Sequence, residues 1–296
     1  MGQILLSALA LGLLWAVMTI GVFITYRILD VADLTVEGSI TLGAATAAAL
    51  IQAGVDPFMA TLAAFGAGMA AGLVTGLLHT LLKIPALLSG ILTMISLYSI
   101  NLMIMGKANI SLLRMNTVYT FFNGLIGDKT LAVIVLGAIV VTAIILILYW
   151  FFGTELGSAI RATGNNQHMV RAQGIDTRKM IIIGLVVSNG LVALSGALIA
   201  QQQSFADIQM GTGSIVIGLA SVIIGEVIFG RRNFMNTLIS LALGAILYRV
   251  IIALVLKAGL PTNDLKLFTA ITVAAALSLP MFKDKINARK GAGKDA

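Results

Sequence analysis

The sequence contains no cysteine and only two histidines, His79 and His168, among its 296 residues. The absence of cysteine excludes disulfides and cysteine-based metal sites. Two histidines are too few for a multi-histidine metal centre. We therefore expect the protein to hold neither a metal ion nor another cofactor.

Charge is scarce as well. Charged residues make up 10% of the chain, whereas a soluble domain usually carries about a quarter. Hydrophobic residues make up 59%, and the mean hydropathy is +1.03. A surface with so little charge is suited to lipid rather than water, so the composition predicts an integral membrane protein.

The charge that is present is mainly basic, with a formal net charge of +7. The basic residues lie between apolar runs, so membrane topology explains them better than binding to nucleic acid does. The tail 283–296 is polar and basic, and we expect it to lie near anionic lipid headgroups. The expected partners therefore include membrane lipid and exclude nucleic acid.

The apolar runs predict an all-α polytopic membrane protein with about nine transmembrane helices, because each crossing needs roughly 20 apolar residues. The first run is read as a retained helix and not as a signal peptide, since no basic residue precedes it. The whole chain, 1–296, then forms a single transmembrane domain. The predicted helices lie near 4–26, 36–52, 58–82, 86–105, 130–152, 180–201, 213–230, 237–256 and 265–282.

The distribution of basic residues predicts the orientation. Thirteen of the 19 Lys and Arg residues fall on the side that is cytoplasmic if the N-terminus lies outside, and five fall on the other side. The positive-inside rule therefore favours an external N-terminus and a cytoplasmic C-terminus. In this topology the longest cytoplasmic connection is 153–179, and the longest external connection is 106–129.

The cytoplasmic connection 153–179 has a helical pattern of its own. Leu156, Ile160 and Thr163 share one face of a first short helix, which ends at the break 164–166. A second short helix follows, and Gly174 is placed to end it. Two helices joined by a tight break would form a rigid projection suited to docking on a soluble partner. The alternative is an ordinary surface loop whose arginines follow the positive-inside rule.

The same segment resembles the coupling loop of ABC importer permeases of the branched-chain amino acid and ribose type. The similarity lies in Gly157, Arg161-Ala162, Gly164-Asn165, Gly174-Ile175 and Arg178. The segment 33–39 and the helix containing 194–197 also resemble this family, in the same order along the chain. Glu37 and Glu226 stand where the sugar permeases have glycine, and the combination is closer to a subgroup associated with tryptophan- and tyrosine-type binding proteins.

The resemblance implies the permease subunit of an ATP-driven importer in the bacterial cytoplasmic membrane. The chain lacks the G-x-x-x-x-G-K-[ST] phosphate loop, so a separate ATPase dimer would hydrolyse ATP. The other implied partners are a second permease copy, as a homodimer, and a periplasmic or lipid-anchored binding protein. The implied solute is small and polar, such as an amino acid, aromatic ones included. The implied coupling residues are Arg161, Gly164, Asn165, Asn166, His168, Arg171 and Gly174.

Polar residues within the predicted helices are candidates for the translocation pathway, because such residues usually face protein or water. Glu226 is predicted to form an interfacial ion pair with Arg231 or Arg232. Each candidate could instead make only hydrogen bonds between helices, and Arg249 could pair with a carboxylate or extend to the membrane surface. The pathway candidates are Glu37, Ser39, Ser96, Asn101, Asn189 and Arg249.

Three alternative functions can be compared with the sequence. A sugar or nucleoside permease of the same family differs only in its solute. A secondary transporter would need no ATPase, but the sequence shows no evident internal repeat. A membrane enzyme would need clustered His, Asp or Glu residues, and these are scattered along the chain.

Overall fold

The computed structural model describes residues 2–257 together with the single positions 271, 274 and 278. All regular elements of the described part are helices, apart from two three-residue strands. The predicted helix at 265–282 lies almost entirely outside the described residues, and the tail 283–296 lies wholly outside them. The count of nine transmembrane helices and the orientation in the membrane therefore stay predictions.

Eight helices of the described part correspond to the first eight predicted runs. Six of them are long and apolar enough to cross a membrane, counting α1 and η1 as one. The elements are α1 (Gly2–Phe23), the π-helix η1 (Ile24–Ile28), α2 (Thr35–Gln52), α3 (Pro57–Thr80), α4 (Ala86–Met105), β1 (Asn109–Ser111), α5 (Val118–Ile126), α6 (Lys129–Gly153), α7 (Glu155–Asn165), α8 (Gln167–Ala172), α9 (Thr177–Gln203), β2 (Phe205–Asp207), α10 (Ser214–Phe229) and α11 (Phe234–Lys257).

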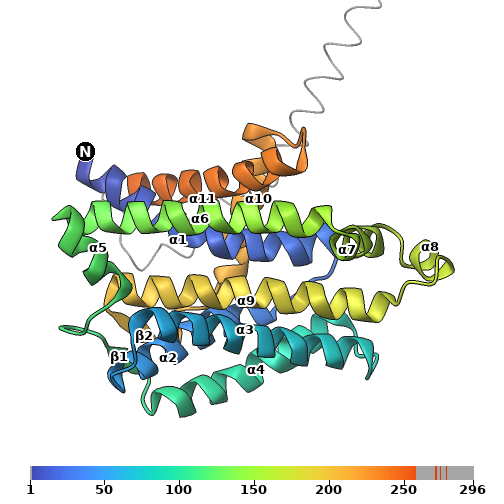
Figure 1. Cartoon of the computed structure of the whole chain (residues 1–296), viewed down its shortest axis with the longest axis horizontal. Coiled ribbons are helices and arrows are strands. Elements are labelled where there is room, and N and C mark those ends of the chain that lie inside the picture. The colour runs from blue at the N-terminus through green and yellow to red at the C-terminus, as the bar shows by residue number, and fades with distance from the viewer. Residues whose placement is uncertain (1, 258–270, 272–273, 275–277, 279–296) are drawn as a thin grey trace, which may run out of the picture.

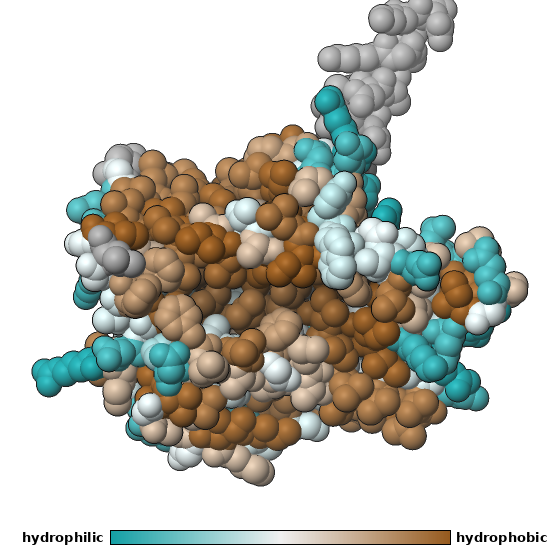
Figure 2. Space-filling model, viewed as in Figure 1, coloured by the Kyte–Doolittle hydropathy of each residue, from teal (hydrophilic) through white to brown (hydrophobic). Residues whose placement is uncertain are grey.

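The long helices run along the long axis of the molecule (Figure 1). The N-terminus, α5 and the two strands lie at one end, and α7 and α8 lie at the other. Apolar residues cover the middle of the visible surface, and hydrophilic residues gather toward its ends (Figure 2). This is the distribution expected of a protein that crosses a bilayer.

The connection 106–129 is more ordered than the sequence indicated. Its strand β1 pairs antiparallel with β2, with Ile110 opposite Ala206. Its helix α5 is fastened to α9, because the hydroxyl of the buried Tyr119 donates to the carbonyl of Leu198 at 3.1 Å. The connection therefore closes this end of the bundle as a packed cap.

Helix α9 lies at the centre of the bundle and approaches its neighbours through glycine. A Cβ at Gly68 or Gly72 of α3 would collide with the backbone of α9. A Cβ at Gly43 of α2 would collide with the backbone of Ala193, and one at Gly196 with that of Ile40. Small residues allow this backbone contact, as they do in many membrane helix pairs. Glycines therefore bring α2 and α3 into close contact with α9.

Candidate functional site

Two short helices begin inside the bundle, and their N-terminal ends meet. Helix α2 has 18 residues and α10 has 16. The backbone N–H of Gly213, the N-cap residue of α10, donates to Oε1 of Glu37 at 2.9 Å. Ser39, one turn from the start of α2, hydrogen-bonds to Asn189 near the middle of α9. The junction therefore lies well inside the molecule, where interrupted membrane helices often form binding sites.

A cavity of about 320 Å³ adjoins this junction. Among the described residues, Glu37 contributes the only charged side chain to its wall, and Asn101 lies in the same wall. Asn101 is 1% exposed, and its Nδ2 donates to the carbonyl of Gly38 at 3.3 Å. The cavity therefore brings together two of the six predicted pathway residues. Its lining residues are Glu37, Gly38, Thr41, Met94, Ile95, Tyr98, Ser99, Asn101, Ile208 and Thr212.

Ser39 and Asn189 bond to each other beside the cavity. Ser39 Oγ donates to Asn189 Oδ1 at 2.6 Å, and Asn189 Nδ2 donates to Asp33 Oδ2 at 2.7 Å. All three side chains are buried. Ser39 and Asn189 therefore form hydrogen bonds between α2 and α9, which is the alternative to a role in the pathway.

Asp33 anchors a second set of buried bonds, which the sequence interpretation missed. Its Oδ1 accepts the backbone N–H of Thr35 at 2.9 Å. The Thr35 hydroxyl bonds to that of Thr75 at 2.7 Å, and Thr75 donates to Thr93 at 2.9 Å. An aspartate two residues before a helix start is a usable signal, because such a side chain often accepts backbone N–H groups there. This series of hydrogen bonds connects the start of α2, inside the bundle, to α3 and α4.

Ser96 and Arg249 lie away from this cavity. Ser96 is exposed, and its hydroxyl bonds within its own helix to the carbonyl of Leu92 at 2.9 Å. The guanidinium of Arg249 lies 3.9 Å from the ring centroid of Trp15. No ion pair joins Arg249 to a carboxylate within residues 2–257, so the predicted pairing is not found there.

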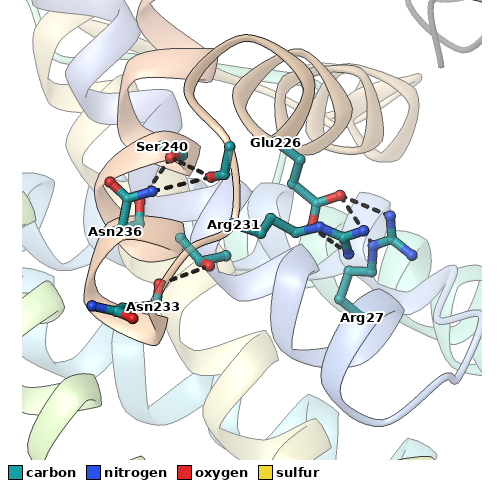
Figure 3. Close-up of polar contacts among 8 residues, drawn as sticks. Arg27, Glu226, Arg231, Asn233, Asn236 and Ser240 are labelled. Carbon is teal, nitrogen blue, oxygen red and sulfur yellow. Dashed lines mark hydrogen bonds and ion pairs between the residues drawn. The ribbon is translucent and has the colours of Figure 1, made fainter. Parts of the chain in front are cut away.

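Glu226 forms an ion-pair cluster at the other end of α10 (Figure 3). Its Oε2 accepts from Nη2 of Arg27 at 2.7 Å, and its Oε1 accepts from Nη1 of Arg231 at 3.5 Å. The Glu226 side chain is only 5% exposed. The predicted pairing with Arg231 is confirmed. The sequence interpretation missed Arg27, the closer partner, because 199 residues separate it from Glu226.

The predicted two-helix projection is confirmed as α7 and α8, which extend from one end of the bundle (Figure 1). Asn166 separates the helices and caps α8, since its Oδ1 accepts the N–H of Met169 at 3.0 Å. Gly174 follows α8 with a φ of +81°, a conformation that favours glycine. Leu156, Ile160 and Thr163 lie one above the other along α7, as their spacing predicts. Ile160 and Thr163 are buried, whereas Leu156, in the first turn, is 51% exposed.

The arginines of this segment hold it to the bundle. Arg161 lies with its guanidinium 5.1 Å from the ring centroid of Phe234. Arg171 donates from Nε to Thr177 Oγ1 at 2.8 Å and from Nη2 to Gln167 Oε1 at 3.3 Å. Both guanidinium groups therefore have contacts within the chain.

Gly164 provides the tightest contact of the segment. A Cβ at this position would overlap the backbone carbonyl of Ile28 in η1. Asn165, Asn166 and His168 are exposed. The segment thus has an inner face fixed to the end of the first helix and an outer face open to a partner. Within the described residues, no group of His, Cys, Asp or Glu could hold a metal ion.

The family profile described as the permease component of a branched-chain amino acid transport system matches residues 4–276. The chain belongs to this permease family. It is 42% identical to a tyrosine transport system permease protein of Clostridioides difficile, over 93% of this chain and 90% of that protein. It is 26% identical to a galactofuranose transporter permease protein of Escherichia coli, over 83% of this chain and 70% of that protein.

An uncharacterized protein of Rickettsia prowazekii is 33% identical, over 93% of this chain and 97% of its own length. No solved structure gives a significant match. Family membership and six helices able to cross a membrane identify the chain as a permease of a transport system. It is a multi-pass protein of the bacterial cytoplasmic membrane.

Proposed function

We propose that this permease is the membrane-spanning subunit of an ABC importer for an amino acid, with aromatic amino acids as the favoured solutes. The observation that carries the proposal is the 42% identity to a tyrosine transport system permease over 93% of the chain. The paired helices α7 and α8 support it, because a rigid projection with an exposed outer face suits docking on a soluble subunit.

The proposal requires partner proteins. The sequence lacks the phosphate-binding loop of P-loop ATPases, so a separate ATPase dimer would drive transport. An external binding protein would deliver the solute, and a second permease copy would complete the pathway. The permease itself would then catalyse no reaction.

A continuous set of contacts offers a route from the docking segment to the cavity. Gly164 of α7 packs on Ile28 of η1, and Arg27 of η1 binds Glu226 at one end of α10. The N–H of Gly213 at the other end of α10 binds Glu37 in the cavity wall. A rigid-body shift of α7 would therefore reach both ends of α10, in the manner of coupled helix movements.

Docking is testable at Met169, which is 45% exposed on α8. Replacing it with glutamate places a charge on the outer face and leaves the inner contacts intact. We expect Met169→Glu to lower copurification of the ATPase at least tenfold, since an unpaired charge in an apolar contact costs roughly 2 kcal/mol or more. Quantitative pull-down of the tagged permease measures this.

The matched control is Met115→Glu, because Met115 is 42% exposed and lies in the connection at the opposite end. It should copurify as the wild type does. Equal loss in both variants, or no loss in Met169→Glu, would contradict docking through α8. A binding screen of the companion binding protein separately tests the solute, and a result with sugars alone would rule out an amino acid.

A further inference from the structure

The cavity beside Glu37 presents a carboxylate oxygen that lacks a donor. Glu37 Oε1 accepts the N–H of Gly213 at 2.9 Å. No residue in the described part of the chain donates to Oε2 or forms an ion pair with this carboxylate. The cavity lining, as far as residues 2–257 form it, contains no Lys, Arg or His. One oxygen of the carboxylate is thus used to cap α10, and the other remains open to a ligand.

Asn101 presents a second acceptor in the same wall. Its Nδ2 donates to the carbonyl of Gly38, and this bond fixes the orientation of the amide, because a flip would set two oxygens against each other. The Oδ1 atom is buried and has no hydrogen-bond partner within residues 2–257. Buried acceptors almost always have partners, so an exception calls for an explanation. Gly38 is next to Glu37 in the chain, and both line the cavity with Asn101.

We propose that this cavity binds the ammonium group of the transported solute, with Glu37 Oε2 and Asn101 Oδ1 as acceptors. An ammonium group has three donors, no acceptor and a positive charge. It therefore complements two oxygens that have no donor and one carboxylate that has no ion-pair partner within the described residues. Met94, Ile95 and Tyr98 line the same cavity, and they suit the apolar or aromatic side chain of an amino acid. This assignment rests on the proposed function and adds to it a site inside the permease.

The competing explanation is that Glu37 serves only as a helix cap. The substitution Glu37→Gln separates the two roles. Glutamine keeps the length of the side chain and the oxygen that accepts from Gly213, but it removes the charge and places donors where a carboxylate oxygen was. A purely structural glutamate would tolerate this change with little effect on ligand binding.

The experiment uses the permease with its ATPase, reconstituted in lipid nanodiscs. Equilibrium dialysis compares L-tyrosine with 3-(4-hydroxyphenyl)lactate, in which a hydroxyl replaces the ammonium group. We expect the wild type to bind L-tyrosine at least tenfold more tightly than the hydroxy acid, since hydrogen bonds to charged groups are the stronger ones. In Glu37→Gln the affinity for L-tyrosine should fall roughly tenfold or more, and the preference should disappear.

A second variant keeps the test valid if Glu37→Gln fails to fold. Asn101→Ala removes the amide acceptor and leaves the cap of α10 in place, and it should weaken L-tyrosine binding roughly fivefold. The control Ser96→Ala lies on the same helix outside the cavity and should bind as the wild type does. Equal binding of the two ligands by the wild type would overturn the assignment. Wild-type affinity in both Glu37→Gln and Asn101→Ala would overturn it as well.

ATP-driven uptake of L-tyrosine by the complete importer, with its binding protein, tests the proposed function separately. Uptake by the wild type together with unchanged binding in both Glu37→Gln and Asn101→Ala would overturn the ammonium site and leave the importer assignment standing. Absence of uptake for every amino acid offered would overturn the importer assignment for amino acids.

Discussion

Replacing Gly196 with valine should eliminate folded permease from the membrane. A Cβ at Gly196 would overlap the backbone carbonyl of Ile40, and a Cβ at Gly43 would overlap that of Ala193. Both obstacles are backbone atoms of packed helices, so no side-chain rotation can relieve the overlap. Overpacking usually costs about 1–3 kcal/mol, and separation of α2 from α9 would add the lost hydrogen bond between Ser39 and Asn189. We expect Gly196→Val and Gly43→Val each to remove most monodisperse protein, measured by fluorescence-detected size exclusion.

The matched control is Gly66→Val on α3. A Cβ at Gly66 meets no heavy atom within 4 Å, although the residue lies in the interior of a long helix. Its helix propensity changes as it does at Gly196, so the comparison isolates packing from propensity. Gly66→Val should keep near wild-type yield and thermal stability. Equal losses at Gly66 and Gly196 would show that propensity, and not backbone contact, determines the result.

Element positions could be predicted from the sequence because the signals are local. Apolar runs located eight of the helices, and the break at Asn166 with Gly174 located α7 and α8. The strands β1 and β2 could not be predicted in this way. Each has three residues, and their pairing joins segments almost 100 positions apart, Asn109 with Asp207. Hydrophobic periodicity carries no information on such a contact.

The candidate site could be predicted only in part, for the same reason. The rarity of ionisable groups in apolar runs singled out Glu37 correctly as unusual. Nothing local could show that the start of α10 would bind its carboxylate, or that Asn101 would share its cavity. Ser39 and Asn189 are also polar residues within apolar runs, yet their side chains hydrogen-bond to each other. The polarity of a residue within an apolar run identifies it as a candidate site residue. Its contacts in the folded structure then determine whether it forms a structural hydrogen bond or faces a ligand site.

In the proposed importer, the ion-pair cluster at Glu226 should determine how ATP hydrolysis is coupled to transport. Substituting Glu226 with glutamine removes the charge that holds Arg27 and Arg231. Breaking a buried ion pair can cost about 3–5 kcal/mol. The side chains of Arg27 and Arg231 are 38% and 54% exposed, so water compensates in part, and we expect a loss of about 1–3 kcal/mol. Thermal unfolding of the purified permease measures this loss.

The functional effect should be separable from the loss of stability. Arg27 lies in η1, on which Gly164 of α7 packs. Its partner Glu226 lies in the last turn of α10. When the link is weakened, α7 can move with the ATPase while α10 does not follow. We expect Glu226→Gln to lower uptake roughly tenfold while ATP hydrolysis by the assembled importer continues, since about 1.4 kcal/mol of lost coupling changes an equilibrium tenfold.

A double-mutant cycle with Arg27→Gln distinguishes this coupling from general damage. If Arg27 and Glu226 act through their shared bond, the double variant should be little worse than either single variant, because each single change already breaks the same contact. Lys179→Gln is the control, since Lys179 forms only an exposed pair with Asp176 at 3.9 Å and should leave uptake unchanged. Additive effects in the cycle, or a parallel fall in uptake and hydrolysis in Glu226→Gln, would contradict a mechanical link. The cluster would then only stabilise the fold, and the movement of α7 would have to reach the cavity through α9, which it also contacts.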